Sequence, residues 1–94
     1  MRTGELRIVN QLGLHARAAA QVVKLAGEFV SRITLIREDK SVFADAKSIL
    51  SVLTLAASRG MTLKLEVEGS AEDTAFDAIT ELFEDGFGEL PAAR

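Results

Sequence analysis

The segment LGLHARAAA, residues 12–20, contains the only histidine of the chain, His15, and places Arg17 two positions after it. A neutral imidazole nitrogen is a nucleophile, and a model histidine titrates near roughly pH 6.5, so this form is abundant in cells. An arginine at this spacing can neutralise the oxygens of an anion. The pair therefore has the groups needed to accept and hold a phosphoryl group. On spacing alone, a histidine that merely caps a helix is the more common interpretation.

The residues that follow His15 predict an amphipathic helix over 16–26. Four apolar residues recur at helical spacing, and three polar ones lie on the opposite face: Ala19, Val22, Val23 and Ala26 against Arg17, Gln21 and Lys24. His15 then stands at the N-terminus of this helix, where N–H groups lack acceptors and the dipole is positive. Such an end binds anions, and we expect the amides of Ala16 and Arg17 to meet phosphate oxygens.

Composition narrows the possible functions. A chain of 94 residues predicts one domain, and a net charge of −3 argues against a nucleic-acid-binding protein. The absence of cysteine excludes disulfides and thiolate sites, and a lone histidine makes a metal site improbable, so we expect no cofactor. Neither a signal-peptide core nor a run of about 18 apolar residues is present, which favours a cytoplasmic protein with no membrane segment.

The hydrophobic pattern predicts four strands and two more helices. The strands are expected over 5–10, 31–37, 41–44 and 61–68, and the helices over 49–57 and from a capping box at Ser70–Asp73 to Gly86. Because each strand has one apolar face, the order β-α-β-β-α-β-α predicts an α+β open-faced sandwich. A four-stranded antiparallel sheet is covered on one face by three helices. We expect one domain over residues 1–88 and a frayed tail over 89–94.

Three segments resemble one family. NQLGLHARAAAQVV resembles the active-site segment of HPr, the histidine-containing phosphocarrier of the bacterial phosphotransferase system. AKSILSVLTLAA is similar to the second helix of that family, and EVEGSAEDTAFDAITELFEDGFGE to its last strand and helix. The resemblance covers roughly residues 5–88 in the family's element order.

The resemblance implies a phosphoryl carrier rather than an enzyme. His15 is expected to accept phosphate on Nδ1 from phospho-enzyme I, which phosphoenolpyruvate charges, and to pass it to a histidine of an EIIA domain. Arg17 matches the arginine of the family motif. The family usually has proline where this chain has Ala18. Alanine should leave the helix intact there, and we expect a changed rate or partner preference rather than lost chemistry.

Position and resemblance together predict two further roles. Ser48 precedes the second helix as an N-cap, and it aligns with the serine that HPr kinase/phosphorylase modifies in many bacteria. A phosphate on Ser48 should slow acceptance at His15. Leu50 lies outside the apolar stripe of its helix, which favours an exposed docking patch. The family's shared surface for enzyme I and EIIA maps onto Ala16, Ala20, Lys24, Lys47, Ile49, Leu50 and Leu53.

Other interpretations stay open. A regulatory HPr-like protein could act only by contacts, for instance with a transcriptional regulator, but such proteins often lack the active histidine. A small acylphosphatase-like enzyme would need an arginine phosphate cradle and a water-positioning asparagine. Asn10 is the only asparagine, and no glycine-rich cradle precedes an arginine, so the sequence disfavours this enzyme. The carrier could serve sugar uptake or the nitrogen-related branch called NPr, which FEDGFGE, residues 83–89, somewhat resembles. We expect a monomer in each case.

Overall fold

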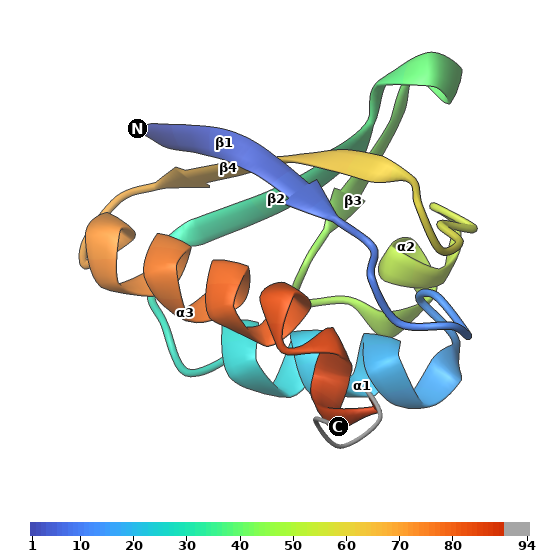
Figure 1. Ribbon diagram of the computed structural model, residues 1–94. Helices are drawn as coiled ribbons and strands as arrows, with labels where there is room; N and C mark the ends of the chain where they lie inside the picture. The colour runs from blue at the N-terminus through green and yellow to red at the C-terminus, as the bar shows by residue number, and fades with distance from the viewer. Residues whose placement is uncertain (90–94) are drawn as a thin grey trace.

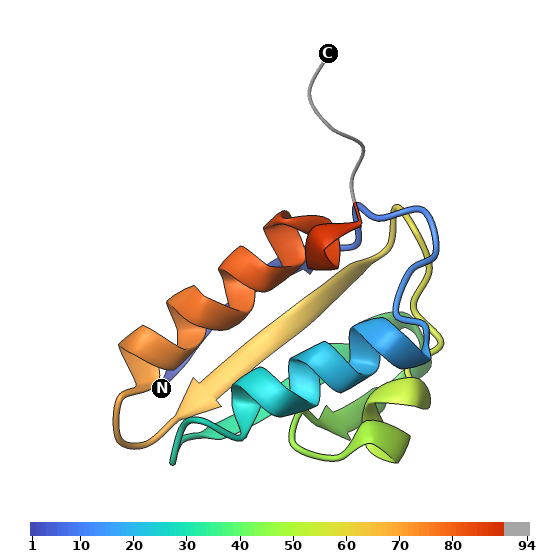
Figure 2. The same cartoon turned by 90° about the horizontal axis from the view of Figure 1, so that it is seen from below.

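The computed structural model describes residues 1–89. Strands β1 (Arg2–Arg7), β2 (Arg32–Arg37), β3 (Val42–Asp45) and β4 (Thr62–Glu68) form one antiparallel sheet in the order β1-β4-β2-β3. Helices α1 (Ala16–Ala26), α2 (Ile49–Leu53) and α3 (Glu72–Glu84) lie on one side of it (Figures 1 and 2). Short 3-10 turns occupy Glu38–Lys40 and Gly86–Gly88. The predicted fold class is confirmed.

The core lies between the sheet and the helices. The inward residues of β4 are fully buried, and their neighbours in the other strands are equally covered: Leu63, Leu65 and Val67 beside Leu6, Ile33 and Leu35. The helices close over them with Ala19, Val22, Val52, Ala75, Ile79 and Phe83. Each large apolar side chain buried in this way contributes about 1.5–3 kcal/mol, so this interface stabilises most of the fold.

The first strand is shifted from its predicted position at 5–10 to Arg2–Arg7. The apolar alternation that marks a strand is interrupted at Gly4, which faces the helices without a side chain. Its place is taken by Phe76 of α3, because a Cβ on Gly4 would lie 2.6 Å from the Phe76 Cζ. The Arg2 guanidinium covers the same ring at 4.2 Å. The ring thus supplies the apolar contact that the strand residue lacks.

The second helix is shorter than the predicted 49–57 and ends at Leu53. Ala56 adopts a left-handed conformation with φ 47°, so the chain turns, and Leu55 and Ala57 are buried. The predicted inward positions Ile49 and Ala56 are exposed instead, which corrects the expected stripe. The turn is held because Arg37 Nη1 donates to the Leu55 carbonyl at 3.0 Å.

The predicted capping box at the start of the third helix is wrong. Ala71 has φ 59° and precedes Glu72, the first helical residue, and no side chain caps the helix at that point. Glu72 still reaches back, and its Oε1 accepts the Gly69 N–H at 3.2 Å. The left-handed residue places Ser70 one position too far from the helix for its hydroxyl to act as the cap.

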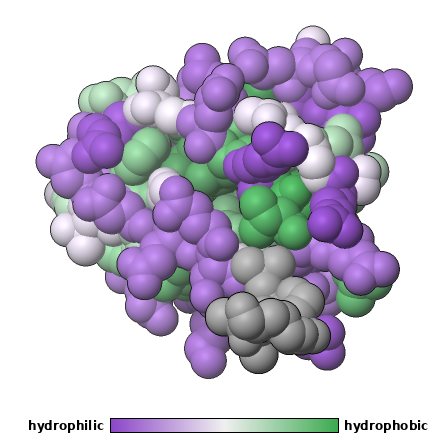
Figure 3. Space-filling view, viewed as in Figure 1, coloured by the Kyte–Doolittle hydropathy of each residue, from purple (hydrophilic) through white to green (hydrophobic). Residues whose placement is uncertain are grey.

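Hydrophilic side chains cover most of the face shown in Figure 3. Across residues 1–89, no helix has the length and apolar character needed to cross a membrane.

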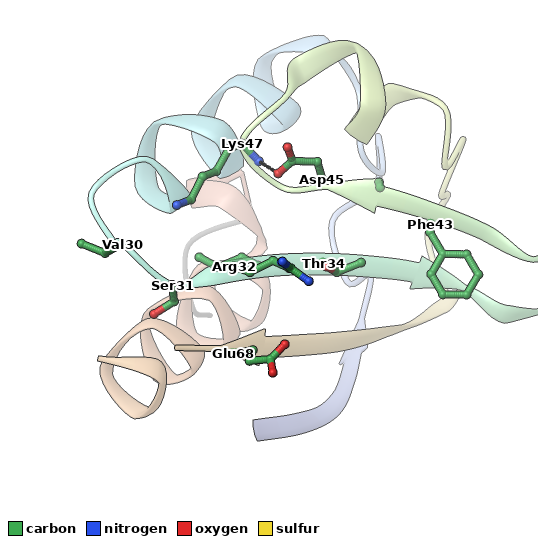
Figure 4. Close-up of a pocket in the computed structure, with 10 residues that line it drawn as sticks. Val30, Ser31, Arg32, Thr34, Phe43, Asp45, Lys47 and Glu68 are labelled. Atoms are coloured by element: carbon green, nitrogen blue, oxygen red, sulfur yellow. Dashed lines mark hydrogen bonds between the residues drawn. The ribbon is translucent and has the colours of Figure 1, made fainter. Parts of the chain in front are cut away.

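A pocket of about 760 Å³ lies along the edge where β2 and β3 meet the chain that enters α2 (Figure 4). Its lining includes Arg32, Phe43 and Lys47 but neither His15 nor Arg17, so it is separate from the predicted chemistry.

Candidate functional site

The loop before α1 sets the position of His15. Gly13 has φ 66°, and a Cβ there would lie 2.6 Å from the Ala57 carbonyl oxygen, so the close approach of the two loops requires glycine. The next residue, Leu14, is buried and donates its N–H to the same carbonyl at 2.9 Å. The turn that shortens α2 therefore fixes the loop that delivers His15 to the helix.

His15 is the N-cap of α1, as predicted. Its backbone is extended, with φ −73° and ψ 177°, and its carbonyl accepts the Ala19 N–H at 2.8 Å. The Nδ1 atom accepts the Arg17 N–H at 3.3 Å. The expectation that the Arg17 amide is free to meet a phosphate is therefore corrected, because the imidazole itself takes this amide in the unmodified protein.

The other ring nitrogen of His15 faces Glu89. The distance from Nε2 to Oε2 of Glu89 is 2.5 Å, and Arg17 Nη2 lies 3.7 Å from the same oxygen. The second carboxylate oxygen, Oε1, accepts from Nδ2 of Asn10 at 2.9 Å. Asn10 is fully buried, and its Nδ2 also donates to the Gly13 carbonyl at 2.9 Å. A chain of contacts thus runs from the buried amide to the imidazole.

These contacts change the acidity of the carboxyl group. The hydrogen bond from Asn10, followed by that from His15, lowers the pKa of Glu89 below its usual value. Partial burial opposes the shift, since it disfavours the charged form, and nearby Arg17 adds to the lowering. Glu89 is therefore ionised at neutral pH and presents a full negative charge to Nε2.

Glu89 reaches this place because the segment after α3 is anchored. Phe87 is buried and packs edge-to-face on Phe83, with ring centroids 4.9 Å apart. Gln21 of α1 donates to the Phe87 carbonyl at 3.2 Å. The sequence predicts a frayed tail over 89–94; in the structure Glu89 is held in the site, and residues 90–94 lie outside the described part of the chain.

Comparison with known proteins identifies the family. The family model described as the PTS HPr component phosphorylation site matches residues 3–85. The chain belongs to the HPr family. The phosphocarrier protein HPr of Cupriavidus necator is 49% identical over 82 residues, which cover 87% of this chain and 90% of that protein. HPr of Xylella fastidiosa is 45% identical over 85 residues, with 90% and 93% covered.

A solved structure agrees with the fold. HPr of Thermoanaerobacter tengcongensis is 38% identical and superposes with a TM-score of 0.89, covering 97% of this chain and all of that one. As an HPr, the chain is a phosphoryl carrier of the phosphotransferase system. Among residues 1–89, no group of three or more histidine, cysteine or acidic side chains is arranged to hold a metal ion.

The apolar residues predicted to form the HPr docking surface lie on two neighbouring helices, α1 and α2. Ala16 and Ala20 of α1 and Ile49 and Leu50 of α2 are exposed, Leu50 by 75%, while Leu53 is half-buried against the core. The two helices pack on one another, and the exposed groups therefore face solvent from neighbouring elements.

The two predicted lysines lie farther from the imidazole. Lys24 is in the last turn of α1, and Lys47 Nζ donates to the Phe29 carbonyl beyond that helix at 2.7 Å. The structure thus places them toward the end of α1 opposite His15.

The structure also places Ser48 and Ala18, the two remaining residues singled out in the sequence. Ser48 is the N-cap of α2, and its Oγ accepts the Ser51 N–H at 3.3 Å, which confirms the capping part of its predicted role. Ala18 is the third residue of α1 and is fully buried. Its small side chain fits the core at the position where the family usually has proline.

The sequence does not reveal Asn10 and Glu89 as members of the site. Asn10 follows the first strand, and its type suggests only a water-positioning residue of an enzyme. The contact between the two spans 79 positions in the sequence, so no local pattern reports it. One local signal is present. Asn10 is the sole asparagine and directly precedes the glycine-bearing loop, and asparagine side chains often bond to loop backbone groups.

Proposed function

We propose that Nδ1 of His15 accepts a phosphoryl group from phospho-enzyme I and passes it to a histidine of an EIIA-type domain. The observation that carries this proposal is the unequal use of the two ring nitrogens. Nε2 is engaged by the Glu89 carboxylate, whereas Nδ1 lies at the N-terminus of α1 and accepts the Arg17 N–H. The ring therefore presents one nitrogen to an incoming phosphorus.

The transfer needs little covalent machinery from the carrier. The lone pair of Nδ1 forms the N–P bond while the bond between phosphorus and the donor breaks, and the donor keeps that electron pair. The Arg17 N–H, released from Nδ1, then faces a phosphate oxygen at the positive end of an 11-residue helix. The Arg17 guanidinium is 71% exposed and can turn from Glu89 toward the new charge.

The rest of the catalytic site comes from the partner. The His15 side chain is about a quarter exposed, at 24%, so a partner protein can reach it. The exposed Ile49 and Leu50 belong to α2, which packs on α1. They offer a small apolar contact, which suits the weak and fast encounters of a carrier with two successive partners. We place the protein in the cytoplasm as a monomer that meets enzyme I and EIIA in turn.

The test mixes the protein with phosphoenolpyruvate, Mg²⁺ and an enzyme I, preferably from the same organism, and follows its mass. We expect an added phosphate that acid removes and base leaves in place, which His15→Ala abolishes. If no phosphate is added while the same enzyme I charges another carrier, the transfer role is contradicted. A regulatory binding protein, for instance one that contacts a transcriptional regulator, then becomes the better function.

Ser48 is the proposed point of regulation by an HPr kinase/phosphorylase. Its hydroxyl caps α2 next to the exposed Ile49 and Leu50, so a phosphate would add nearly two negative charges to the proposed docking patch. We expect phosphorylated Ser48 to slow acceptance at His15 by weakening the encounter with enzyme I. Treatment with such a kinase, followed by the same mass assay, tests this role.

A further inference from the structure

We propose that Glu89 is a positioning residue for phosphoryl transfer. Its carboxylate, held by the buried Asn10 amide, fixes the His15 ring and balances the charge that the ring acquires. This inference rests on the proposed phosphorylation of His15 and assigns a role to a residue near the end of the chain. The 2.5 Å contact from Nε2 to Oε2 and the 2.9 Å contact from Asn10 to Oε1 carry it.

The first effect concerns the proton on the ring. A carboxylate only accepts hydrogen bonds, so the short contact to Glu89 requires the proton of the neutral imidazole to reside on Nε2. The Arg17 N–H points at Nδ1 and requires a lone pair on that atom. Both neighbours therefore select the one tautomer in which Nδ1 is nucleophilic.

The second effect concerns charge. No proton leaves His15 when the N–P bond forms, because Nε2 keeps its hydrogen, and the ring of the phosphohistidine becomes cationic. Glu89 then faces this cation at Nε2. The phosphoryl group is attached at Nδ1, the other ring nitrogen. The carboxylate thus stabilises the charged product, and the imidazole separates it from the phosphate.

The third effect concerns rigidity. The Glu89 side chain is only 15% exposed, and its two oxygens serve two different donors, one of them fully buried. The Asn10 amide is itself fixed by the Gly13 carbonyl within the loop that precedes His15. The ring is therefore held from its Nε2 side by a support that does not depend on a partner protein.

A carboxylate is needed for this arrangement. Glutamine at position 89 would offer one acceptor oxygen, whereas Asn10 and His15 both donate to the present side chain. An amide N–H turned toward Nε2 would instead favour the opposite tautomer, with the proton on Nδ1. We therefore expect Glu89→Gln to impair the site in spite of its similar shape.

The experiment compares wild type, Glu89→Ala, Glu89→Gln and the control Glu84→Gln, which removes the same charge from an exposed position of α3. The ¹⁵N spectrum of the imidazole reports the tautomer at about pH 9, where a model imidazole is neutral. Because His15 is the only histidine, its signals are unambiguous. The same four proteins are then charged with enzyme I and phosphoenolpyruvate, and the initial rate is measured.

We expect the wild type and Glu84→Gln to hold the proton on Nε2 and to accept phosphate at equal rates. Both Glu89 variants should show a mixture of tautomers and a rate reduced about tenfold, the scale of one lost charge-assisted hydrogen bond. Unchanged tautomers, or an unchanged rate, in Glu89→Ala would overturn the inference. A wild type that accepts no phosphate contradicts the proposed function itself, which is a different outcome from equal rates in all four proteins.

Discussion

The Arg17 backbone N–H and the His15 Nδ1 atom form a hydrogen bond of 3.3 Å, and it uses the lone pair that attacks phosphorus in the transfer proposed above. In the proposed transfer this hydrogen bond breaks, and we expect the freed amide to donate to a phosphate oxygen. A helix N-terminus provides such a donor without any side-chain movement. In the unmodified protein, the Arg17 N–H is therefore already placed where the phosphate of the proposed product would bind.

Arg17→Ala should slow phosphorylation of His15 while leaving the fold intact. The guanidinium is mostly exposed and lies only 3.7 Å from a single carboxylate oxygen, so its loss costs little stability. The variant also lacks the guanidinium that would neutralise the phosphate oxygens. The rate of phosphorylation should therefore fall roughly ten- to hundredfold, as expected for the loss of one interaction between ions. The initial rate with enzyme I measures this effect. Arg7→Ala, an exposed change on β1, is the control and should keep the wild-type rate.

Leu50→Ser tests the proposed docking patch. Leu50 is 75% exposed, so its replacement should alter the free energy of unfolding by no more than about 0.5 kcal/mol. The encounter with enzyme I should weaken, and the rate at low concentration should fall severalfold. Val30→Ser is the matched control, since Val30 is apolar and 86% exposed just beyond α1. Equal rates for the two variants would remove Leu50 from the interface.

Ser48→Ala separates capping from regulation. The hydroxyl accepts the Ser51 N–H, and its removal should lower the free energy of unfolding by about 1 kcal/mol. Denaturant unfolding measures this cost, with Ser70→Ala as the control because the exposed Ser70 hydroxyl does not cap α3. Ser48→Asp should keep the cap and slow phosphate acceptance. Wild-type acceptance by Ser48→Asp would argue against an electrostatic effect of Ser48 modification.

The Glu89 carboxyl should titrate at unusually low pH. Its pKa is lowered in the folded protein, so its contacts contribute full stability above the usual glutamate pKa of about 4.3. That contribution is lost as the pH falls through the lower, folded value. A ¹³C titration of the side-chain carboxyl measures the midpoint. Asn10→Ala removes the largest cause of the shift and should raise this midpoint; a midpoint that stays in place would exclude Asn10 as its origin.

Much of the fold could be predicted because it depends on local periodicity. The alternation in MTLKLEVE gives a strand in register with two neighbours, and the spacing after His15 gives α1 within its observed bounds. The errors occur where a distant contact overrides the local pattern. Gly4 extends β1 because Phe76 fills its place, and α2 ends early because Arg37 and Leu14 bind the carbonyls of the turn that follows.

The site also has a part that a local segment of sequence reveals and a part that depends on distant contacts. His15 and Arg17 stand two residues apart at a helix end, so one short segment contains both. Its resemblance to the HPr active-site segment, rather than the spacing alone, points to them as a site. Asn10 and Glu89 meet only after α3 has packed and Phe87 has anchored the segment behind it. A glutamate near the end of a chain carries no local mark of such a contact. The expectation of a frayed tail follows from position alone and misses the anchor.

The most direct measurement is the identity of the phosphorylated ring nitrogen. The protein is labelled with ¹⁵N, charged with enzyme I and phosphoenolpyruvate, and examined for ¹⁵N–³¹P coupling in the imidazole of its single histidine. We predict coupling at Nδ1 and a proton retained on Nε2, because Glu89 holds the latter atom at 2.5 Å. Coupling at Nε2, or phosphate bound elsewhere in the chain, would contradict the account.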